Sequence, residues 1–144
     1  MKVRCIFNTG KALREFEYST LGNPSEFGRF GVSEYSEYNE IKVGSTYLVM
    51  GLIIFRNYQA YLIDDDGFIT LCPCQLFEII DHNISPNWHF RLIEKNEMIY
   101  PFIQSIFGYY ELCFDMNSYE NIIINRDEVA QQTYFVRKME LEDT

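Results

Sequence analysis

Two cysteines one residue apart, Cys72 and Cys74, are the first candidates for chemistry, because thiolates are ligands for zinc. Four other side chains could complete such a site: Cys5, Cys113, His82 and His89. Structural zinc sites draw their ligands from paired C-x-x-C segments, whereas this spacing is C-x-C without a second pair. On a strand the two thiols would share a face, where they could also pack as small apolar core residues. We therefore favour core packing and expect no metal ion.

A second candidate is the acidic turn Asp64–Asp65–Asp66–Gly67. An EF-hand calcium loop places oxygen ligands at alternating positions over about twelve residues and ends in a bidentate Glu, and the residues after Gly67 supply no such ligands. Asp and Gly tolerate positive φ, so this segment predicts a solvated hairpin turn. Its acidic tip could contact a cationic partner.

The chain offers no recognisable catalytic motif. The sequence has no G-x-S-x-G nucleophile elbow, no H-E-x-x-H segment and no phosphate-binding loop. Asp81 and His82 form a tempting acid–base pair, but consecutive residues on a strand point to opposite faces. We therefore name no catalytic residue and no cofactor, and we leave enzymatic activity open while favouring a non-enzymatic role.

The formal net charge of −9 limits the class of partner. Acidic residues exceed basic ones only after residue 44, so the chain lacks the clustered Lys and Arg of a nucleic-acid-binding protein. A basic protein partner is compatible with this charge, although negative charge also simply keeps proteins soluble. The sequence shows neither the apolar core of a secretory signal nor an apolar window of about 18 residues. We expect a cytoplasmic protein that does not bind membranes.

Residues 9–42 form a long segment with weak periodicity, which predicts an extended first loop. Its second half alternates tyrosine with glutamate, and such a surface suits contact with basic side chains. Together with the acidic turn, it gives the candidate partner-binding residues Glu34, Tyr35, Glu37, Tyr38, Glu40, Asp64, Asp65 and Asp66. The alternative is that this loop packs over one end of the fold and has no separate role.

Short strands must position these side chains. Alternation and β-branched or aromatic residues predict strands over 2–8, 47–55, 58–63, 68–72, 75–81 and 88–92, with a bend at Gly51. Their close spacing after a long first loop predicts an α+β, mainly β fold with an SH3-like small barrel of about five strands. The barrel would span about residues 1–93 of a single domain covering 1–144.

The last third of the chain changes period, which predicts helices between about residues 97 and 140. Pro101 and Gly108 suit the ends of a short helix over residues 101–107, whereas residues 117–124 are ambiguous. Asn125 and Glu128 have the spacing of a capping box and predict a helix that ends near Glu140. This helix should dock through one face: Val129, Phe135, Val136 and Met139.

Several segments resemble a known family. The series KVGSTYLVMG (42–51), YLIDDDGFI (61–69), PCQLFEIID (73–81) and NWHF (87–90), followed by GYYEL (108–112), is similar to small uncharacterised bacterial proteins with an SH3-like barrel. Cys72 and Cys74 depart from this pattern, where an aromatic residue is expected. Some members are suspected to be immunity proteins that neutralise toxins. The resemblance implies a structural scaffold and supplies no catalytic residue.

Two hypotheses from different classes follow. The first is a cytosolic inhibitor of immunity type that binds a basic toxin domain through the acidic and tyrosine-rich residues named above. The second is a small-molecule-binding or enzymatic barrel with an aromatic pocket, which requires an apolar cavity with converging polar groups. The oligomeric state does not follow from the sequence.

Overall fold

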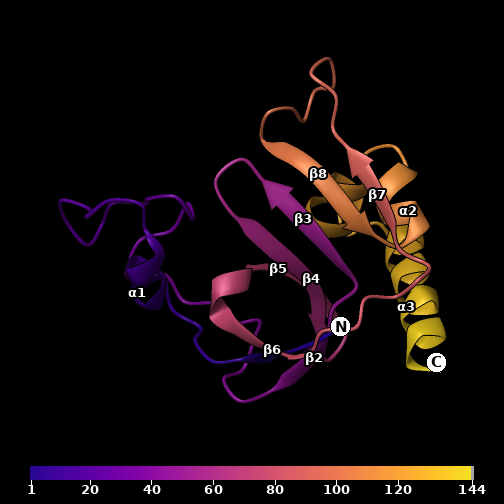
Figure 1. The fold of residues 1–144 in the computed structure, drawn as a ribbon, viewed down its shortest axis with the longest axis horizontal. Coiled ribbons are helices and arrows are strands. Elements are labelled where there is room, and N and C mark those ends of the chain that lie inside the picture. Colours follow the sequence, from indigo (N-terminus) through magenta and orange to yellow (C-terminus); the bar gives the residue numbers. More distant parts are fainter. Residues whose placement is uncertain (144) are drawn as a thin grey trace.

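Eight strands in two antiparallel sheets form the centre of the molecule (Figure 1). A computed structural model describes residues 1–143. The three-stranded sheet has the order β2 (Thr46–Leu48), β1 (Lys2–Cys5) and β6 (Phe77–Asp81). The five-stranded sheet has the order β5 (Phe68–Pro73), β4 (Gln59–Asp65), β3 (Gly51–Phe55), β8 (Ile103–Gly108) and β7 (His89–Leu92). The expected α+β, mainly β class is confirmed, but neither sheet closes on itself among the described residues.

The two sheets meet where β2 passes into β3. Val49 donates its N–H to the Met1 carbonyl at 3.0 Å, whereas Met50 donates to Leu62 of β4 at 2.8 Å. The segment predicted as one bent strand over 47–55 is therefore two strands that belong to different sheets. Gly51 lies directly after the crossing, and a Cβ there would lie 2.4 Å from Leu112 Cδ2. The close contact thus explains why a residue without a side chain stands at this position.

The predicted acidic hairpin turn is confirmed. Asp66 and Gly67 connect β4 to β5 with φ values of 50° and 91°. Positive φ at both central residues is typical of a two-residue turn whose twist matches its strands. Strand β6 likewise follows a short linker, the 3-10 turn η2 (Cys74–Leu76).

The helix predicted over residues 101–107 is wrong. Residues Ile103–Gly108 form β8, which pairs with β3 on one side and with β7 on the other. Ile103 and Ile106 are 0% and 1% exposed, so this segment is a central strand of the larger sheet. The proline signal at Pro101 was local, and pairing with two neighbouring strands decided the structure.

Six helical segments complete the fold of residues 1–143. They are α1 (Gly10–Leu13), η1 (Arg14–Phe16), η2, α2 (Tyr110–Phe114), the π-helical turn η3 (Glu120–Ile124) and α3 (Glu128–Glu142). The ambiguous segment 117–124 thus ends in η3. The cap predicted at Asn125 is wrong by two residues, because Asp127 accepts a hydrogen bond from the Ala130 N–H at 3.0 Å. The helix itself extends slightly beyond the predicted end.

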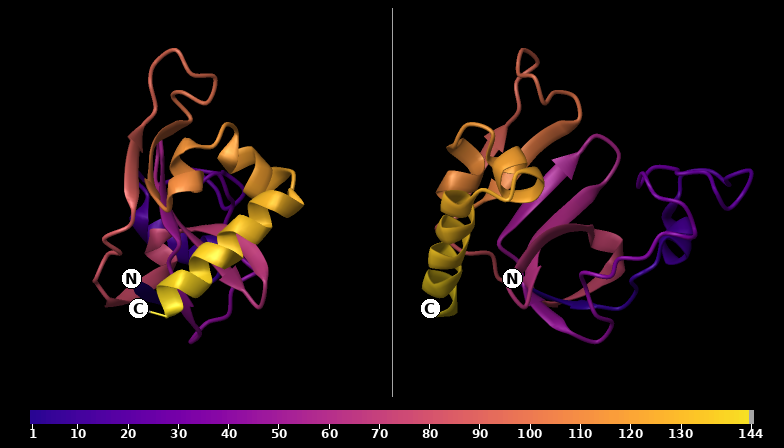
Figure 2. Two further views of the ribbon diagram at one scale, coloured as in Figure 1. Left: turned by 90° about the vertical axis from the view of Figure 1, so that its right-hand side faces the viewer. Right: turned by 180° about the vertical axis from the view of Figure 1, so that it is seen from behind.

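Helix α3 packs against the five-stranded sheet, as Figure 2 shows from behind. Tyr134 is 0% exposed and joins the core cluster around Ile53, Leu62 and Ile106. The docking of this helix is confirmed, but its predicted contact face is wrong for Val129, Val136 and Met139, which are exposed. Of the predicted face, only Phe135 packs against the core. A second core cluster, which includes Val3, Ile63 and Leu76, lies between the two sheets.

Candidate functional site

The acidic turn contributes less free negative charge than its sequence indicates. Asp64 is only 9% exposed, and its Oδ1 accepts hydrogen bonds from the Tyr134 hydroxyl at 3.0 Å and from Lys138 Nζ at 2.7 Å. Its second oxygen accepts from the Gly67 N–H at 3.2 Å. This carboxylate therefore connects the hairpin to α3, which leaves it poorly placed to contact a partner.

Asp65 also has internal partners. One carboxylate oxygen accepts from the Tyr47 hydroxyl at 2.9 Å, and the other lies 3.3 Å from Lys42 Nζ. The Tyr47 hydroxyl in turn accepts a hydrogen bond from the Lys42 N–H at 2.9 Å. Burial, followed in importance by Asp65, raises the pKa of Tyr47 to about 12. Asp66 is therefore the turn carboxylate that points to solvent.

The candidate residues of the loop are spread over different surroundings. Tyr35 is 74% exposed, whereas Tyr38 is half-buried against the core between the sheets. Glu40 accepts a hydrogen bond from the Thr70 hydroxyl at 3.4 Å, which brings the end of the loop beside β5. Glu34 lies earlier in the loop, where its N–H donates to the Pro24 carbonyl. Glu37 is exposed. The structure thus places Glu40 beside β5 and Tyr38 against the core, whereas Tyr35 and Glu37 are the exposed candidates of the loop.

Two arginines hold the loop in place. Arg14 donates to the Val32 carbonyl at 3.1 Å and pairs with Glu17 at 3.2 Å. Arg29 donates to the Asn57 carbonyl at 2.9 Å and lies 4.1 Å from the centre of the Tyr18 ring. The loop also buries three apolar side chains: Leu13, Phe30 and Ile41. The alternative that this segment packs over the fold is confirmed for those three residues.

The cysteines are core residues to different degrees. Cys72 is 0% exposed, whereas Cys74 lies in η2 beyond the end of β5 and is half-buried. Burial raises the pKa of both thiols to about 12, so neither is a thiolate near neutral pH. Within residues 1–143, no group of three or more His, Cys, Asp or Glu is placed to hold a metal ion.

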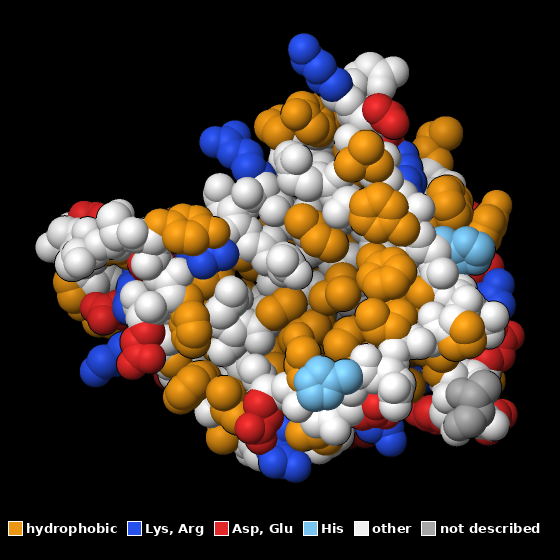
Figure 3. Space-filling model, viewed as in Figure 1, with side chains coloured by type: hydrophobic (Ala, Val, Ile, Leu, Met, Phe, Trp, Pro, Cys, Tyr) orange, Lys and Arg blue, Asp and Glu red, His pale blue; other side chains and the backbone are white. Residues whose placement is uncertain are grey.

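The largest functional candidate is a surface that the sequence did not single out. Strands β3, β8 and β7 carry apolar side chains on the side of the sheet that faces away from α3 (Figure 3). We call this surface the apolar face, and it consists of Leu52, Ile54, Trp88, Phe90, Leu92 and Phe107.

The register of the strands makes the apolar face continuous. Phe107 lies opposite Leu52 on one side and opposite Phe90 on the other. Trp88 contacts the Phe107 ring edge to face, with ring centres 5.2 Å apart. Phe90 and Leu92 are each 59% exposed. The other four side chains are half-buried, and Leu52 and Trp88 also pack against the core between the sheets. A contiguous apolar surface with two exposed side chains at its outer edge is a candidate contact site.

The other half of this sheet has a cover. Tyr61 of β4 is 5% exposed because its ring packs edge to face on Phe77 of the three-stranded sheet, with centres 5.6 Å apart. The smaller sheet does not extend as far as β7. The sequence shows the alternation of Trp88, Phe90 and Leu92, but this pattern does not predict whether another element packs on that face.

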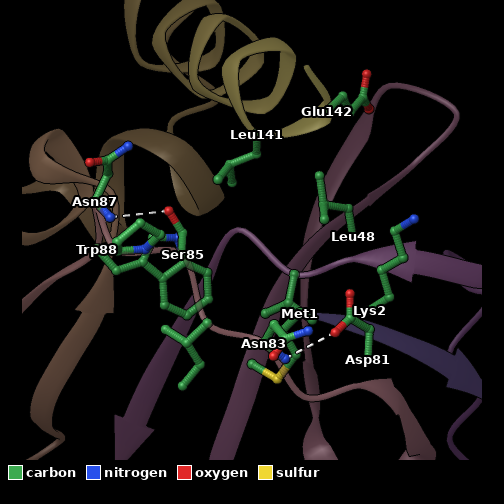
Figure 4. Close-up of a pocket in the computed structure, with 13 residues that line it drawn as sticks. Met1, Lys2, Leu48, Asp81, Asn83, Ser85, Asn87, Trp88, Leu141 and Glu142 are labelled. Atoms are coloured by element: carbon green, nitrogen blue, oxygen red, sulfur yellow. Dashed lines mark hydrogen bonds between the residues drawn. The ribbon is translucent and has the colours of Figure 1, made fainter. Parts of the chain in front are cut away.

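A cavity of about 530 Å³ adjoins the apolar face at Trp88. Figure 4 shows Trp88, Ser85 and Asn87 on one side of it, Met1, Lys2 and Leu48 on another, and Leu141 and Glu142 of α3 above. We call it the Trp88 pocket. Its volume lies in the range of small-molecule sites, roughly 300 to 1,000 Å³.

Polar groups at the rim of the Trp88 pocket carry both signs of charge. Lys2, Asp81 and Glu142 line it. The N–H of Asn83 donates to Asp81 at 3.0 Å and holds the pKa of that carboxyl below its ordinary value. The Trp88 indole N–H is buried without a hydrogen-bond acceptor among the described residues.

Comparison with protein-family models, with curated proteins and with solved structures finds no match for this chain. No helix within residues 1–143 is both long enough and apolar enough to cross a membrane.

Proposed function

We propose that this protein is a non-enzymatic protein-binding module, namely a cytoplasmic inhibitor of immunity type that covers the active site of a basic toxin domain. The apolar face is the observation that carries the proposal. Aromatic and aliphatic side chains exposed together give a partner the dehydrated centre that protein interfaces need. The net charge of −9 favours a cationic partner and accelerates its encounter.

We also propose that residues 1–81 form an SH3-like unit, which is shorter than the barrel over about residues 1–93 that the sequence predicted. The antiparallel pairs β1–β2, β1–β6, β3–β4 and β4–β5, with a 3-10 turn before β6, support this. In this arrangement β8 and β7 extend the second sheet beyond the unit, and the apolar face lies on the extension. Exposed loop residues such as Tyr35, Glu37 and Asp66 would then add contacts and steering at the periphery.

The test uses the purified protein and the products of the genes next to its own. We expect a stable complex in size-exclusion chromatography with one of these products, and an association rate that falls by roughly tenfold or more between low and high salt. Failure of every neighbouring product to bind, or an association rate indifferent to salt, would count against the proposal.

A matched pair of variants locates the interface. Phe90→Ala removes a ring from the apolar face, and Phe27→Ala removes a ring of similar exposure, 64% against 59%, from the loop. We expect Phe90→Ala to weaken binding by roughly tenfold or more and Phe27→Ala to change it less than about twofold. The reverse result, joined by a loss in Tyr35→Ala, would move the interface to the loop.

The Trp88 pocket supports a second candidate function, the binding of a small molecule. Apolar walls at Leu48 and Trp88, with Lys2 and Asp81 at the rim, suit a zwitterion with an apolar side chain. Free leucine and phenylalanine are the probes, and the fluorescence of Trp88, the single tryptophan, is the readout. A saturable change that Leu48→Phe abolishes would favour this function, whereas no change at millimolar probe would exclude these ligands.

A further inference from the structure

Strand β7 forms an open edge of the five-stranded sheet. Ile93 donates its N–H to the Gln104 carbonyl at 3.0 Å, which makes residues 93 and 104 a hydrogen-bonded pair. Such pairs alternate along antiparallel strands, so Arg91 also bonds to β8 whereas Phe90 and Leu92 direct their N–H and C=O groups outward. Within residues 1–143, no donor or acceptor is recorded for these outward groups.

The opposite edge of the same sheet is protected. Arg126 donates from its guanidinium to the Ile69 carbonyl of β5 and lies 4.1 Å from the centre of the Phe68 ring. The turn η3 also packs against β5. Proteins commonly block exposed strand edges in this way, because an open edge pairs with other chains. Helix α2 also packs against β7, where Cys113 binds the His89 carbonyl and Arg91. The β5 edge is therefore blocked at Ile69, whereas β7 is open at the outward groups of Phe90 and Leu92.

The side chains at the open edge match the backbone. Phe90 and Leu92, which have the outward backbone groups, also point their side chains onto the apolar face. A strand added beside β7 would satisfy these groups and set every second side chain next to Phe90 and Leu92. The apolar face would continue onto the added strand without a break.

We propose that the partner binds by adding one of its β-strands to the outer edge of β7, with apolar residues at alternate positions and basic residues between them. This inference rests on the proposed function, because it names the part of the partner that meets the apolar face. The basic residues follow from the net charge of −9 on this chain. The same charge disfavours a second copy as the occupant, since two copies repel each other.

The probe is a blocked peptide of about eight residues in which valine alternates with lysine. Each residue opposite Phe90 or Leu92 would exchange hydrogen bonds with β7 and point its side chain onto the apolar face, so these positions are the valines. A second peptide carries N-methyl groups on the valines, and a third carries equally many on the lysines, whose N–H groups face away from β7. Binding is followed by Trp88 fluorescence and by amide hydrogen exchange.

We expect the unmodified and lysine-methylated peptides to bind and to slow the exchange of the Phe90 and Leu92 amides. Methylation of the valines should weaken binding by about tenfold or more. Phe90→Pro removes the outward N–H, and it should bind the peptide roughly twofold to tenfold more weakly than Phe90→Ala does. The matched control is Ile79→Pro on β6, whose N–H also points outward by the same alternation. Circular dichroism checks that each variant is folded.

The outcomes separate this inference from the proposed function. Equal binding of the valine- and lysine-methylated peptides would overturn strand addition and leave docking on the apolar face intact. If no peptide binds while Phe90→Ala still weakens the protein complex, only strand addition is overturned; if neither effect occurs, both proposals are. A dimer of the free protein that Phe90→Pro dissociates would assign the edge to a second copy and would also overturn the inference.

Discussion

Removing a single hydroxyl group tests how α3 is joined to the sheet. The Tyr134 hydroxyl is buried and donates to Asp64 Oδ1 at 3.0 Å, so Tyr134→Phe deletes this bond and keeps the ring in the core. A hydrogen bond to a charged group contributes about 1.5 to 3 kcal/mol. Lys138 and the Gly67 N–H still bind the carboxylate, which places the expected loss near about 2 kcal/mol. For a chain of this size, the melting temperature should fall by roughly 6 to 8 °C.

Asp64→Ala should cost more, about 3 to 4 kcal/mol, because it leaves the Tyr134 hydroxyl without an acceptor and Lys138 without its buried partner. Urea unfolding followed by Trp88 fluorescence measures both variants and the double variant. The two losses should not add, and their sum should exceed the loss in the double variant by about 1 to 2 kcal/mol. Tyr35→Phe is the control, since that side chain is 74% exposed. A Tyr134→Phe protein as stable as this control would refute the reasoning.

Three further predictions concern other parts of the chain. The Arg137 guanidinium, bonded to Glu111 at 2.7 and 2.8 Å, lowers the pKa of that carboxyl. The contribution of this pair to stability is therefore present above the ordinary pKa of Glu111 and is lost as pH falls through the lowered value. Glu111→Gln should cost about 1 kcal/mol in urea unfolding near pH 7, and this cost should shrink as the pH falls through the lowered pKa. Iodoacetamide at about pH 8 should label Cys72 and Cys74 slowly in the folded protein and rapidly in urea, as read by mass spectrometry, because burial raises the pKa of both thiols to about 12; equal rates would contradict this. Gly108→Ala should lower the free energy of unfolding by about 1 to 3 kcal/mol, because its Cβ would lie 3.0 Å from the Met50 carbonyl oxygen and the Gly51 Cα. Gly31→Ala is the control: its Cβ would meet nothing within 4 Å, so this variant reports only the cost of the positive φ at that position.

Local signals predicted the parts of the fold that depend on a few neighbouring residues. The Asp66–Gly67 turn needs positive φ, and the sequence has suitable residues at that point. The strands around it combine aromatic and β-branched residues, such as Tyr61, Ile63, Phe68 and Ile69, and lie near their predicted positions. The segment 103–108 was misread because one partner, β3, lies about 50 residues earlier in the chain and the other, β7, is separated from it by residues 93–102. A proline at a plausible helix start was then the strongest remaining signal.

Helix α3 shows why the acidic turn was overestimated as a contact surface. A hydrophobic pattern selected Val129 and Val136 as its docking face, but the helix docks through Tyr134 and Lys138, which bind Asp64. Ala130, Tyr134 and Leu141 recur at helical spacing on the docked face, but a small alanine and a hydroxyl-bearing ring give a weaker hydrophobic signal than Val129 and Val136. The same hydrogen bonds remove one of the three aspartates from the surface. The acidic run in the sequence therefore predicts local negative charge. Whether a given aspartate is free to contact a partner depends on residues about 70 positions away, such as Tyr134 for Asp64.

The exposure of the apolar face likewise depends on residues that are distant in sequence. The alternation of Trp88, Phe90 and Leu92 indicates that the three side chains share one face of the sheet. An apolar face of a sheet is usually packed on the core. Here α2 packs against β8 and β7 on one side of the sheet, where Tyr134 of α3 joins Ile106 in the core, whereas Phe90 and Leu92 on the other side stay exposed. Open backbone groups at β7 coincide with it, whereas the edge at β5 is blocked by Arg126. The open edge and the uncovered face belong to the same strand. A partner that supplies one strand would therefore pair with the open backbone groups and cover the exposed side chains at the same time, without any contact to the loop residues of this chain.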